Sequence, residues 1–321
     1  IDSMKILITG ATGHIGRHIL TRLHNHEVVI ITRSKASLTE KNSLPSKLEI
    51  IEANLTEKGS IKKIKDFLSQ TSNPIDACLH LAGESIDTRW TIEKKAQIRQ
   101  SRVDSAQNLI AAFESIESKP KIFICASAIG FYGDRGSDIL TEDSPPGQDF
   151  LAKLCYDWEV QTDLALQGWT GTRIAHIRMG VVLSPDGGML KTILPLFNAN
   201  LGAPLGSGHQ WMGWIHIADL INIYILAIEN EKVTGPINAV SPYSVTNLHF
   251  SKALAKTLNK LCLPSVPSIA LKLLLGEMSS LVLNSQRVKP HKLISHQIGF
   301  NFQFDTIEAL KDLLIKKDTK K

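Results

Sequence analysis

Short apolar runs alternate with amphipathic stretches along the first half of the chain. Aliphatic runs typical of strands buried in a parallel sheet occupy 5–9, 27–32, 48–52, 77–81 and 121–125, and a sixth strand is expected within 171–179. Apolar residues at helical spacing predict helices at 17–24, 61–69, 91–115 and 150–166. Because strands alternate with helices, the pattern predicts an α/β fold with a Rossmann-like, doubly wound parallel sheet.

The pattern changes after about Gly180. Glycine and proline become frequent at 184–188 and 201–208, which is typical of loops and short elements. Alternating phenylalanines predict a strand at 299–304, followed by a helix at 306–316. We therefore expect a nucleotide-binding Rossmann domain over 4–180, with segments near 210–245 returning to it, and a smaller C-terminal substrate-side subdomain over 181–317.

A glycine-rich loop follows the first predicted strand and precedes a helix. Its glycines are Gly10, Gly13 and Gly16. In a dinucleotide-binding loop, the first glycine permits a tight turn, the second lets the backbone approach phosphate, and the third lets the helix pack on the sheet. The helix then offers its amides and positive dipole end to the anion. This context predicts a pyrophosphate-binding loop, and a tight turn without a ligand is the alternative.

The end of the second predicted strand indicates which dinucleotide would bind. Thr32 and Arg33 stand there, and no acidic residue is present to bond a ribose 2′-hydroxyl. An arginine can pair with a 2′-phosphate through two parallel hydrogen bonds. The sequence therefore favours NADP(H), although Arg33 as a solvated loop cation is the alternative.

Composition narrows the choice of partners. The chain has 321 residues, 43% hydrophobic and 21% charged, and a net charge of +5 without any lysine- or arginine-rich run interleaved with aromatics, so nucleic-acid binding is not expected. The four cysteines are scattered without a CxxC motif, which favours a reducing, cytoplasmic location and no metal site. No apolar run reaches the length of a membrane span. We expect a monomer or homodimer that acts on a small-molecule substrate, which the sequence does not identify.

Three longer motifs carry a family resemblance. They are LAGESI at 81–86, ASAIGFYGDRG at 126–136 and LGSGHQWMGWIH at 205–216, accompanied by 149–159 and by GFNF at 299–302. Together they resemble the atypical epimerase family proteins in the extended branch of the short-chain dehydrogenase/reductase superfamily, over nearly the whole chain. The resemblance implies an NADP-dependent oxidoreductase or epimerase-like protein. It also implies cofactor contacts at Thr12, Gly13, His14, Ile15, Gly16, Thr32, Arg33, Asn54, Leu55, Leu81, Ala82, Gly83 and Glu84.

The usual catalytic pair of that superfamily is absent. A typical member places a tyrosine and a lysine four residues apart on one helix face, where the lysine lowers the pKa of the tyrosine. None of the four tyrosines here is followed by a lysine at that spacing. Aligned on the helix after Pro146, the two positions hold Leu151 and Cys155.

The resemblance implies other candidates for the chemistry. Ser127, with Ala128 as the alternative match, stands for the superfamily's serine. Arg102 stands where an asparagine is usual and is expected to contact the cofactor. Ser127, Tyr132 and Cys155 are the candidate catalytic residues. Each also has a structural reading, as a loop cap, a packing residue and a small buried residue respectively. If none is catalytic, the alternative is a non-catalytic NADP(H)-binding redox sensor or regulatory protein.

Two expectations concern charges near these candidates. Arg135 is the cation closest in sequence to Tyr132, and it would have to lie beside Tyr132 for the tyrosine to act as an acid or base. Glu159 is expected on a solvated helix face, in an ion pair within its helix.

The substrate side is expected after the sixth strand. Arg178 lies near the end of that strand, and Lys191, Trp211 and His216 follow in the glycine-rich part of the chain. These side chains are predicted to form a wall near the nicotinamide that binds a planar or anionic ligand. Anchoring of a subdomain by tryptophan and a structural role for His216 are the alternatives.

Overall fold

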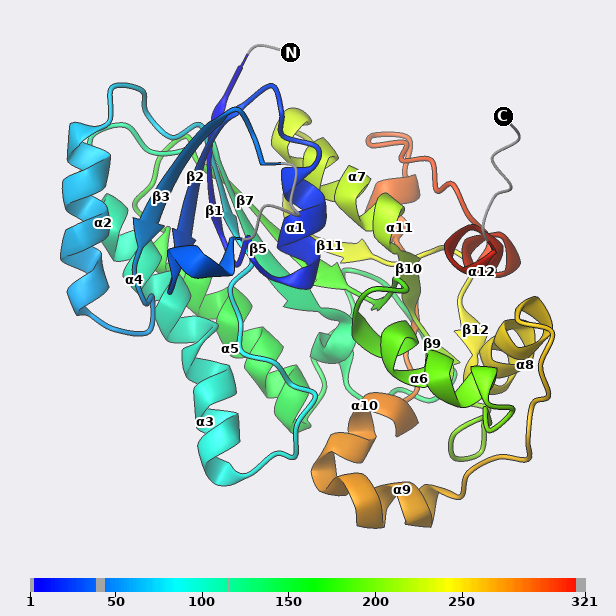
Figure 1. Ribbon diagram of the computed structural model, residues 1–321. Helices are drawn as coiled ribbons and strands as arrows, with labels where there is room; N and C mark the ends of the chain where they lie inside the picture. Colours follow the sequence, from blue (N-terminus) through cyan, green and yellow to red (C-terminus); the bar gives the residue numbers. More distant parts are fainter. Residues whose placement is uncertain (1–2, 39–43, 115, 316–321) are drawn as a thin grey trace.

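A computed structural model describes residues 3–38, 44–114 and 116–315. The ends of two predicted helices, at Ser115 and Lys316, lie outside these described residues. The centre of the molecule is a seven-stranded sheet in the order β11-β7-β5-β4-β1-β2-β3 (Figure 1). Every neighbouring pair is parallel, which confirms the predicted doubly wound sheet. Its strands are β1 (Lys5–Thr9), β2 (Glu27–Thr32), β3 (Lys47–Glu52), β4 (Ala77–His80), β5 (Ile122–Ala128), β7 (Arg173–Met179) and β11 (Gly235–Ala239).

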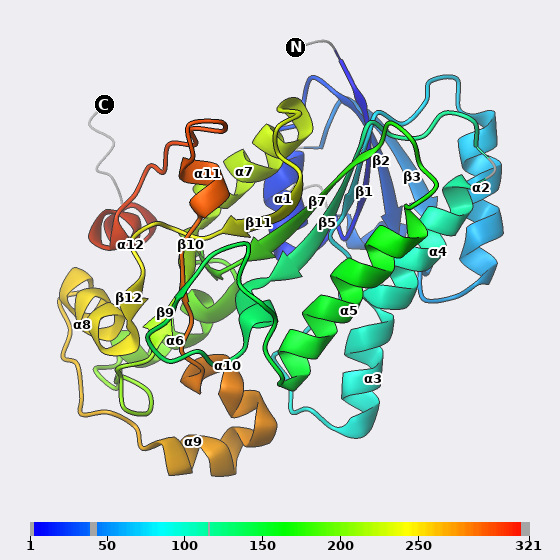
Figure 2. The same cartoon turned by 180° about the vertical axis from the view of Figure 1, so that it is seen from behind.

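Helices cover both faces of the sheet (Figures 1 and 2). One face carries α1 (His14–Leu20) and α7 (Ile217–Glu229), which bury Leu20 and Leu220 against Ile6 and Ile8 of β1. The other carries α2 (Gly59–Gln70), α4 (Val103–Phe113) and α5 (Phe150–Ala165), packed on Leu7 and its neighbours. Because successive residues of a strand point to opposite faces, a strand covered on both sides is apolar throughout.

The long helix predicted at 91–115 is two helices. The first, α3 (Ile92–Gln100), ends at Ser101, and α4 begins at Val103. The Ser101 hydroxyl bonds the Ile98 carbonyl and accepts from the Glu84 amide at 2.8 Å, so local side-chain bonds compete with a continuous helix there. The break turns Ser101 toward the loop after β4.

The second half of the chain is more regular than the loops and short elements expected of it. After β8 (Val181–Leu183) come α6 (Gly188–Asn198), β9 (Trp211–Met212) and β10 (Trp214–His216). The chain then returns through α7 to β11, which adds a parallel strand beside β7. The remaining elements are η1 (Lys35–Ser37), η2 (Ile129–Tyr132), β6 (Ile139–Leu140), β12 (Val245–Thr246), α8 (Asn247–Thr257), α9 (Ser268–Leu275), η3 (Gly276–Ser279), α10 (Ser280–Leu283), β13 (Arg287–Val288), α11 (His291–Ile294) and α12 (Thr306–Leu314).

The strand predicted at 299–304 does not form. The segment pairs with no strand among the described residues, and the Gln303 amide bonds the Asp219 carboxylate at 3.3 Å instead. The alternating phenylalanines still have a packing role, because Phe302 packs on the core beneath α7 and Phe304 stacks on His216. Among the helices that the structure describes, none combines the length and apolarity needed to cross a membrane.

Candidate functional site

A cleft opens at the carboxyl edge of the sheet, where β1 and β4 lie side by side and the chain order reverses. This topological switch point is where open α/β sheets bind ligands. The cleft has a volume of about 230 Å³. Its walls come from the glycine loop and from the segments after β2, β3 and β4. The lining residues are Gly10, Thr12, Gly13, Ile31, Thr32, Arg33, Ala53, Asn54, Leu55, Thr56, Leu81, Ala82, Gly83, Glu84, Ser101 and Ser105.

The glycine loop has the geometry that its sequence predicts. Gly10 has a φ of 70°, and a Cβ atom there would lie 2.7 Å from the backbone carbon of Leu81. A Cβ atom on Gly16 would lie 2.4 Å from the Gly10 carbonyl oxygen. Gly13 precedes the first residue of α1 and carries no side chain to cap the helix. The N-terminal amides of α1 are therefore left for an anion.

A buried hydrogen-bond chain holds the floor of the cleft. The Thr9 hydroxyl lies 2.9 Å from His80 Nδ1 and accepts from the Ala82 amide at 3.2 Å. The other ring nitrogen of His80 lies 3.1 Å from the Ser105 hydroxyl. Burial lowers the pKa of His80 to about 4, so the ring is neutral at pH 7. These contacts fix the ends of β1 and β4 relative to α4.

Arg33 stands at the rim of the cleft. Its side chain is exposed and makes no hydrogen bond or ion pair with any residue that the structure describes. Glu84 lies on the cleft wall, and its pKa is lowered chiefly by a hydrogen bond from Lys94 at 2.8 Å and further by the charges of Arg33 and Arg102. Arg33 is thus free to pair with an anion in the cleft.

Arg102 lies behind the loop after β4. Its guanidinium donates to the Glu84 carbonyl at 3.0 Å and the Ile98 carbonyl at 3.2 Å, and it lies 5.5 Å from the Trp158 ring. A Cβ atom on Gly83 would lie 3.1 Å from its central carbon. Burial lowers the pKa of Arg102, which the Cys155 thiol and Glu84 partly offset. The positive charge of Arg102 therefore acts on Cys155, the position aligned with the lysine of the usual catalytic pair.

The cleft brings together most of the predicted cofactor residues, but not all of them. His14, Ile15, Gly16 and Arg102 lie outside its lining. Sequence reasoning missed five lining residues: Ile31, Ala53, Thr56, Ser101 and Ser105. Ser101 and Ser105 reach the cleft through the break between α3 and α4, for which the only sequence signal was Ser101 within a helical pattern.

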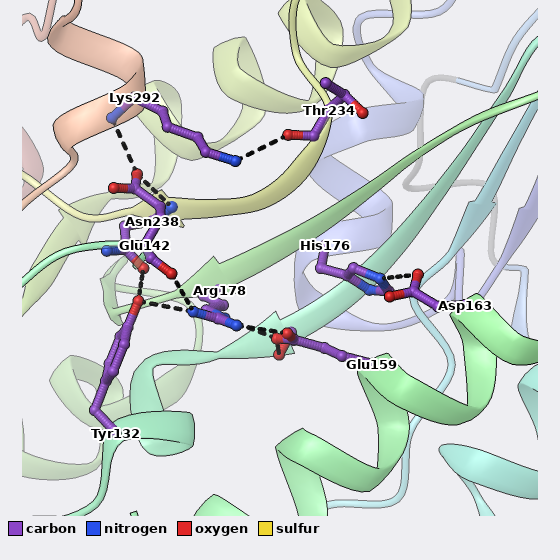
Figure 3. Close-up of polar contacts among 10 residues, drawn as sticks. Tyr132, Glu142, Glu159, Asp163, His176, Arg178, Thr234, Asn238 and Lys292 are labelled. Carbon is purple, nitrogen blue, oxygen red and sulfur yellow. Dashed lines mark hydrogen bonds and ion pairs between the residues drawn. The ribbon is translucent and has the colours of Figure 1, made fainter. Parts of the chain in front are cut away.

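Three of the predicted functional residues lie instead in a buried polar network at the end of β7, and Figure 3 labels two of them, Tyr132 and Arg178. Arg178 forms two hydrogen bonds to the Glu159 carboxylate, at 2.9 and 2.7 Å, and donates to the Tyr132 hydroxyl at 3.0 Å. The Ser127 hydroxyl donates to the same carboxylate at 2.6 Å. None of these four residues is more than 6% exposed. Glu159 is therefore not on a solvated helix face, and its partner comes from β7 rather than from its own helix.

Tyr132 is enclosed by this network. Its hydroxyl donates to Asn238 Oδ1 at 2.7 Å, and burial raises the pKa of Tyr132 to about 12 although Arg178 opposes the rise. The expected neighbour Arg135 is elsewhere, since it donates to the Pro145 carbonyl at 3.2 Å. Tyr132 thus has a cationic neighbour but stays protonated at neutral pH.

Glu142 closes the far side of the network. One of its oxygens, Oε1, accepts from the backbone amide of Asn238 at 3.1 Å and from the backbone amide of Lys292 at 3.2 Å (Figure 3). The second oxygen, Oε2, is buried without a hydrogen-bond partner among the described residues. The network therefore ties η2, α5, β7, β11 and α11 together.

Cys155 lies under η2, with 3% of its surface exposed. Burial raises the pKa of its thiol to about 12, so the thiolate is not formed at neutral pH. A Cβ atom on Gly130 would lie 3.4 Å from Leu151 and 3.9 Å from the Cys155 sulfur, which places both helix positions against η2. The structure fits the reading of Cys155 as a small buried residue.

The predicted substrate residues do not converge on the cleft, whose lining contains none of them. Arg178 donates four hydrogen bonds within the buried network, and Lys191 is exposed on α6. Trp211 in β9 lies 4.2 Å from the Arg287 guanidinium. His216 caps α7 by accepting from the Ala218 amide at 3.1 Å, and its other ring nitrogen lies 3.5 Å from Asp312. Its stacked ring is 3% exposed, which supports a structural role.

Two family models match the chain. The first, described as the NAD dependent epimerase/dehydratase family, matches residues 6–241. The second, described as a domain of unknown function (DUF1731), matches residues 266–313. The boundary between them falls after β11, the last strand of the main sheet.

Similar proteins extend over nearly the whole chain. The epimerase family protein SDR39U1 homolog, chloroplastic, of Arabidopsis thaliana is 35% identical, covering 98% of this chain and 87% of its own length. The crystal structure of the human epimerase family protein SDR39U1 (isoform 2) with NADPH has a TM-score of 0.80 at 30% identity, covering 97% of this chain and 99% of the human one. UDP-glucuronic acid 4-epimerase from Bacillus cereus, in complex with UDP-glucuronic acid and NAD, shares the fold at 20% identity with a TM-score of 0.74, covering 97% and 98%.

Proposed function

The chain belongs to the NAD dependent epimerase/dehydratase family, and we propose that it binds NADP(H) in the cleft and acts as an NADP-dependent oxidoreductase on a small-molecule substrate. The observation that carries the choice of cofactor is Arg33, an exposed cation on the cleft rim without a partner among the described residues. A guanidinium in that state recognises a phosphate more readily than a hydroxyl. The human relative that was solved with NADPH supports the same choice.

The residues of the cleft fit the proposed cofactor. Gly10 and Gly16 keep the loop tightly folded beside the cleft, because a Cβ atom at either position would collide with neighbouring backbone atoms. The amides at the start of α1 would hold the pyrophosphate, and Arg33 with Thr32 would hold the 2′-phosphate. When bound, NADP(H) supplies or accepts a hydride.

Arg102 supports an active role for the site. It places a buried positive charge beside Gly83 and Cys155, where typical superfamily members have their lysine. Two of its contacts are backbone carbonyls, and a guanidinium has five N–H donors, so donors remain for a ribose or substrate oxygen. We therefore assign to Arg102 the orienting role of the missing lysine.

A binding titration tests the choice of cofactor. NADPH and NADH are titrated by calorimetry into the wild-type protein, into Arg33→Ala and into Arg22→Ala, an exposed arginine at the far end of α1 as the control. Loss of a charge-assisted hydrogen bond costs about 1.5–3 kcal/mol, so Arg33→Ala should weaken NADPH binding about 10- to 100-fold and leave NADH binding unchanged. Equal affinity of the wild type for NADPH and NADH would overturn the assignment.

A non-catalytic NADP(H)-binding sensor is the second candidate. It is favoured by the burial of Ser127, Tyr132 and Cys155, each of which is 3% exposed or less. Oxidation of NADPH is followed by nicotinamide absorbance with aldehydes, ketones and quinones, for the wild type and for Arg102→Met. Turnover that Arg102→Met reduces supports the oxidoreductase, whereas full NADPH affinity without turnover of any of these classes supports the sensor.

A further inference from the structure

Two histidines and an aspartate meet where the glycine loop touches the second half of the chain. His14 and His18 are one helical turn apart at the start of α1, a spacing that puts both rings on one face. Asp186 comes from the loop between β8 and α6. One ligand atom from each of the three residues lies within 4.8 Å of the other two.

The His14 ring has no hydrogen-bond partner. Both of its nitrogens are buried, and neither bonds any residue that the structure describes. The ring is not part of the cleft lining. It packs over Gly187, and a Cβ atom built on Gly187 would lie 2.4 Å from the His14 ring. A buried imidazole without a partner is costly, and a ligand between the ring and Asp186 would remove that cost.

The other two groups already stand at metal-ligand spacing. His18 Nε2 lies 3.3 Å from Asp186 Oδ2. Two ligands bound to tetrahedral zinc at about 2.0–2.1 Å are separated by about 3.3 Å. The second oxygen of Asp186 accepts a hydrogen bond from the Ser184 hydroxyl, which orients the carboxylate.

The cluster faces charges of both signs and also solvent. Burial lowers the pKa of His14, while Asp186 opposes this. Arg17 and Lys191 are the positive charges that act on His14 besides His18. Asp186 is 59% exposed and His18 34%, which leaves the cluster open to solvent on one side.

We propose that His14, His18 and Asp186 bind a divalent transition metal, with zinc as the best match to two imidazoles and one carboxylate. Three protein ligands leave a fourth position open to water. The ion would join the glycine loop to the loop between β8 and α6. The expectation of no metal site rested on the cysteines, and the overlooked sequence signal was the spacing of His14 and His18.

Zinc titration in the absence of any nucleotide tests this site separately from the proposed cofactor. Metal-stripped protein without a histidine tag is titrated with zinc chloride by calorimetry, and with cobalt(II) by visible absorbance. The variants are His18→Ala and Asp186→Asn, with the exposed His24→Ala as the matched control, and circular dichroism checks the fold of each. His14 is left unchanged because its backbone belongs to the glycine loop.

We expect one zinc ion per chain and a four-coordinate cobalt spectrum for the wild type and for His24→Ala. Since even outer partners of metal ligands contribute 10- to 100-fold to affinity, His18→Ala should weaken zinc binding by more than about 100-fold, and Asp186→Asn should also weaken it. The proposal is overturned if the wild type binds no stoichiometric zinc, or if His24→Ala weakens binding as much as His18→Ala does.

Discussion

Two arginines at the carboxyl edge of the same sheet have opposite environments. Arg33 directly follows β2, is exposed, and has no partner among the residues described. Arg178 lies near the end of β7, is 4% exposed, and is bonded to Glu159, Tyr132 and a backbone carbonyl. The difference shows that position at the functional edge does not make a residue functional. An unpaired charge at a cleft can recognise a ligand, whereas a charge neutralised in the core holds the scaffold together.

The same comparison separates the two groups of predicted site residues. The cofactor residues line a cleft in which backbone amides and Arg33 remain available. The candidate catalytic residues Ser127 and Tyr132 are bonded to the two members of one buried ion pair, because Glu159 accepts from Ser127 and Arg178 donates to Tyr132. A substrate could reach their polar atoms only by breaking buried hydrogen bonds, which costs about 1–3 kcal/mol for each group left unsatisfied.

Removal of Glu159 should have the largest effect on stability. Glu159→Ala leaves the Arg178 guanidinium buried without its carboxylate, and breaking such a pair costs about 3–5 kcal/mol. We expect urea denaturation to show a free energy of unfolding lower by that amount. Because the network lies outside the cleft lining, the NADPH affinity of the folded variant should stay within about twofold of the wild type, which is well under 1 kcal/mol.

An exposed ion pair provides the matched comparison. Arg99 lies 3.7 Å from Asp104 and 3.6 Å from Asp157, and it is 49% exposed. Exposed pairs contribute about 0–1 kcal/mol, so Arg99→Ala should change the unfolding free energy by less than that. If Glu159→Ala lowered the free energy of unfolding as little as Arg99→Ala does, the Arg178 network would not stabilise the fold. The structural role that distinguishes Arg178 from Arg33 would then be wrong.

Acid should weaken the floor of the cleft through His80. Its folded-state pKa of about 4 lies below the ordinary histidine value of 6.5, so the neutral ring stabilises the folded state fully above pH 6.5. This contribution is lost as the pH falls from 6.5 through 4, because the unfolded chain takes up the proton first. The shift corresponds to a loss on the order of 3 kcal/mol, measured by urea denaturation at a series of pH values.

The variant His80→Gln separates this effect from general acid denaturation. Glutamine keeps hydrogen-bonding capacity toward Thr9 and Ser105 but does not titrate. The difference in unfolding free energy between wild type and His80→Gln should therefore shrink as the pH falls from 6.5 to 4. A difference that stays constant over this range would contradict the role given to His80.

The sequence was sufficient for the parts of the fold that depend on local pattern. Aliphatic runs located the first six strands of the sheet, and the glycine spacing located the turn at Gly10, whose positive φ excludes most side chains. The sequence placed segments near 210–245 with the Rossmann domain, but helix α7 and strand β11 were not identified there because glycine and proline nearby suggested loops. The strand at 299–304 was predicted wrongly because alternation shows burial on one side but not the presence of a neighbouring strand.

The sequence could predict site residues only where their chemistry follows from their position next to a strand or loop. Arg33 needed no more than its place after a strand. The pairing of Arg178 with Glu159 joins residues 19 positions apart on different elements, and the bond from Tyr132 to Asn238 spans 106 positions. No periodicity in the sequence encodes such contacts. The sequence could therefore name Ser127, Tyr132 and Arg178 as candidates, but it could not show that their polar groups are hydrogen-bonded within one buried network.

Removal of the Tyr132 hydroxyl should have a smaller effect than the loss of Glu159 or the titration of His80, and it tests most directly whether the network is structural. Tyr132→Phe keeps the ring that packs on Phe131 and removes the bonds to Asn238 and Arg178, which keep their other partners. We expect the free energy of unfolding to fall by about 1–2 kcal/mol in urea at pH 7. The burial that raises the pKa of Tyr132 to about 12 also predicts that wild-type stability declines as the pH rises from 10 to 12, because the unfolded tyrosine ionises first. Tyr132→Phe should lack this part of the decline. Loss of NADPH turnover in a variant that keeps both its stability and its NADPH affinity would instead make Tyr132 catalytic and overturn the contrast with Arg33.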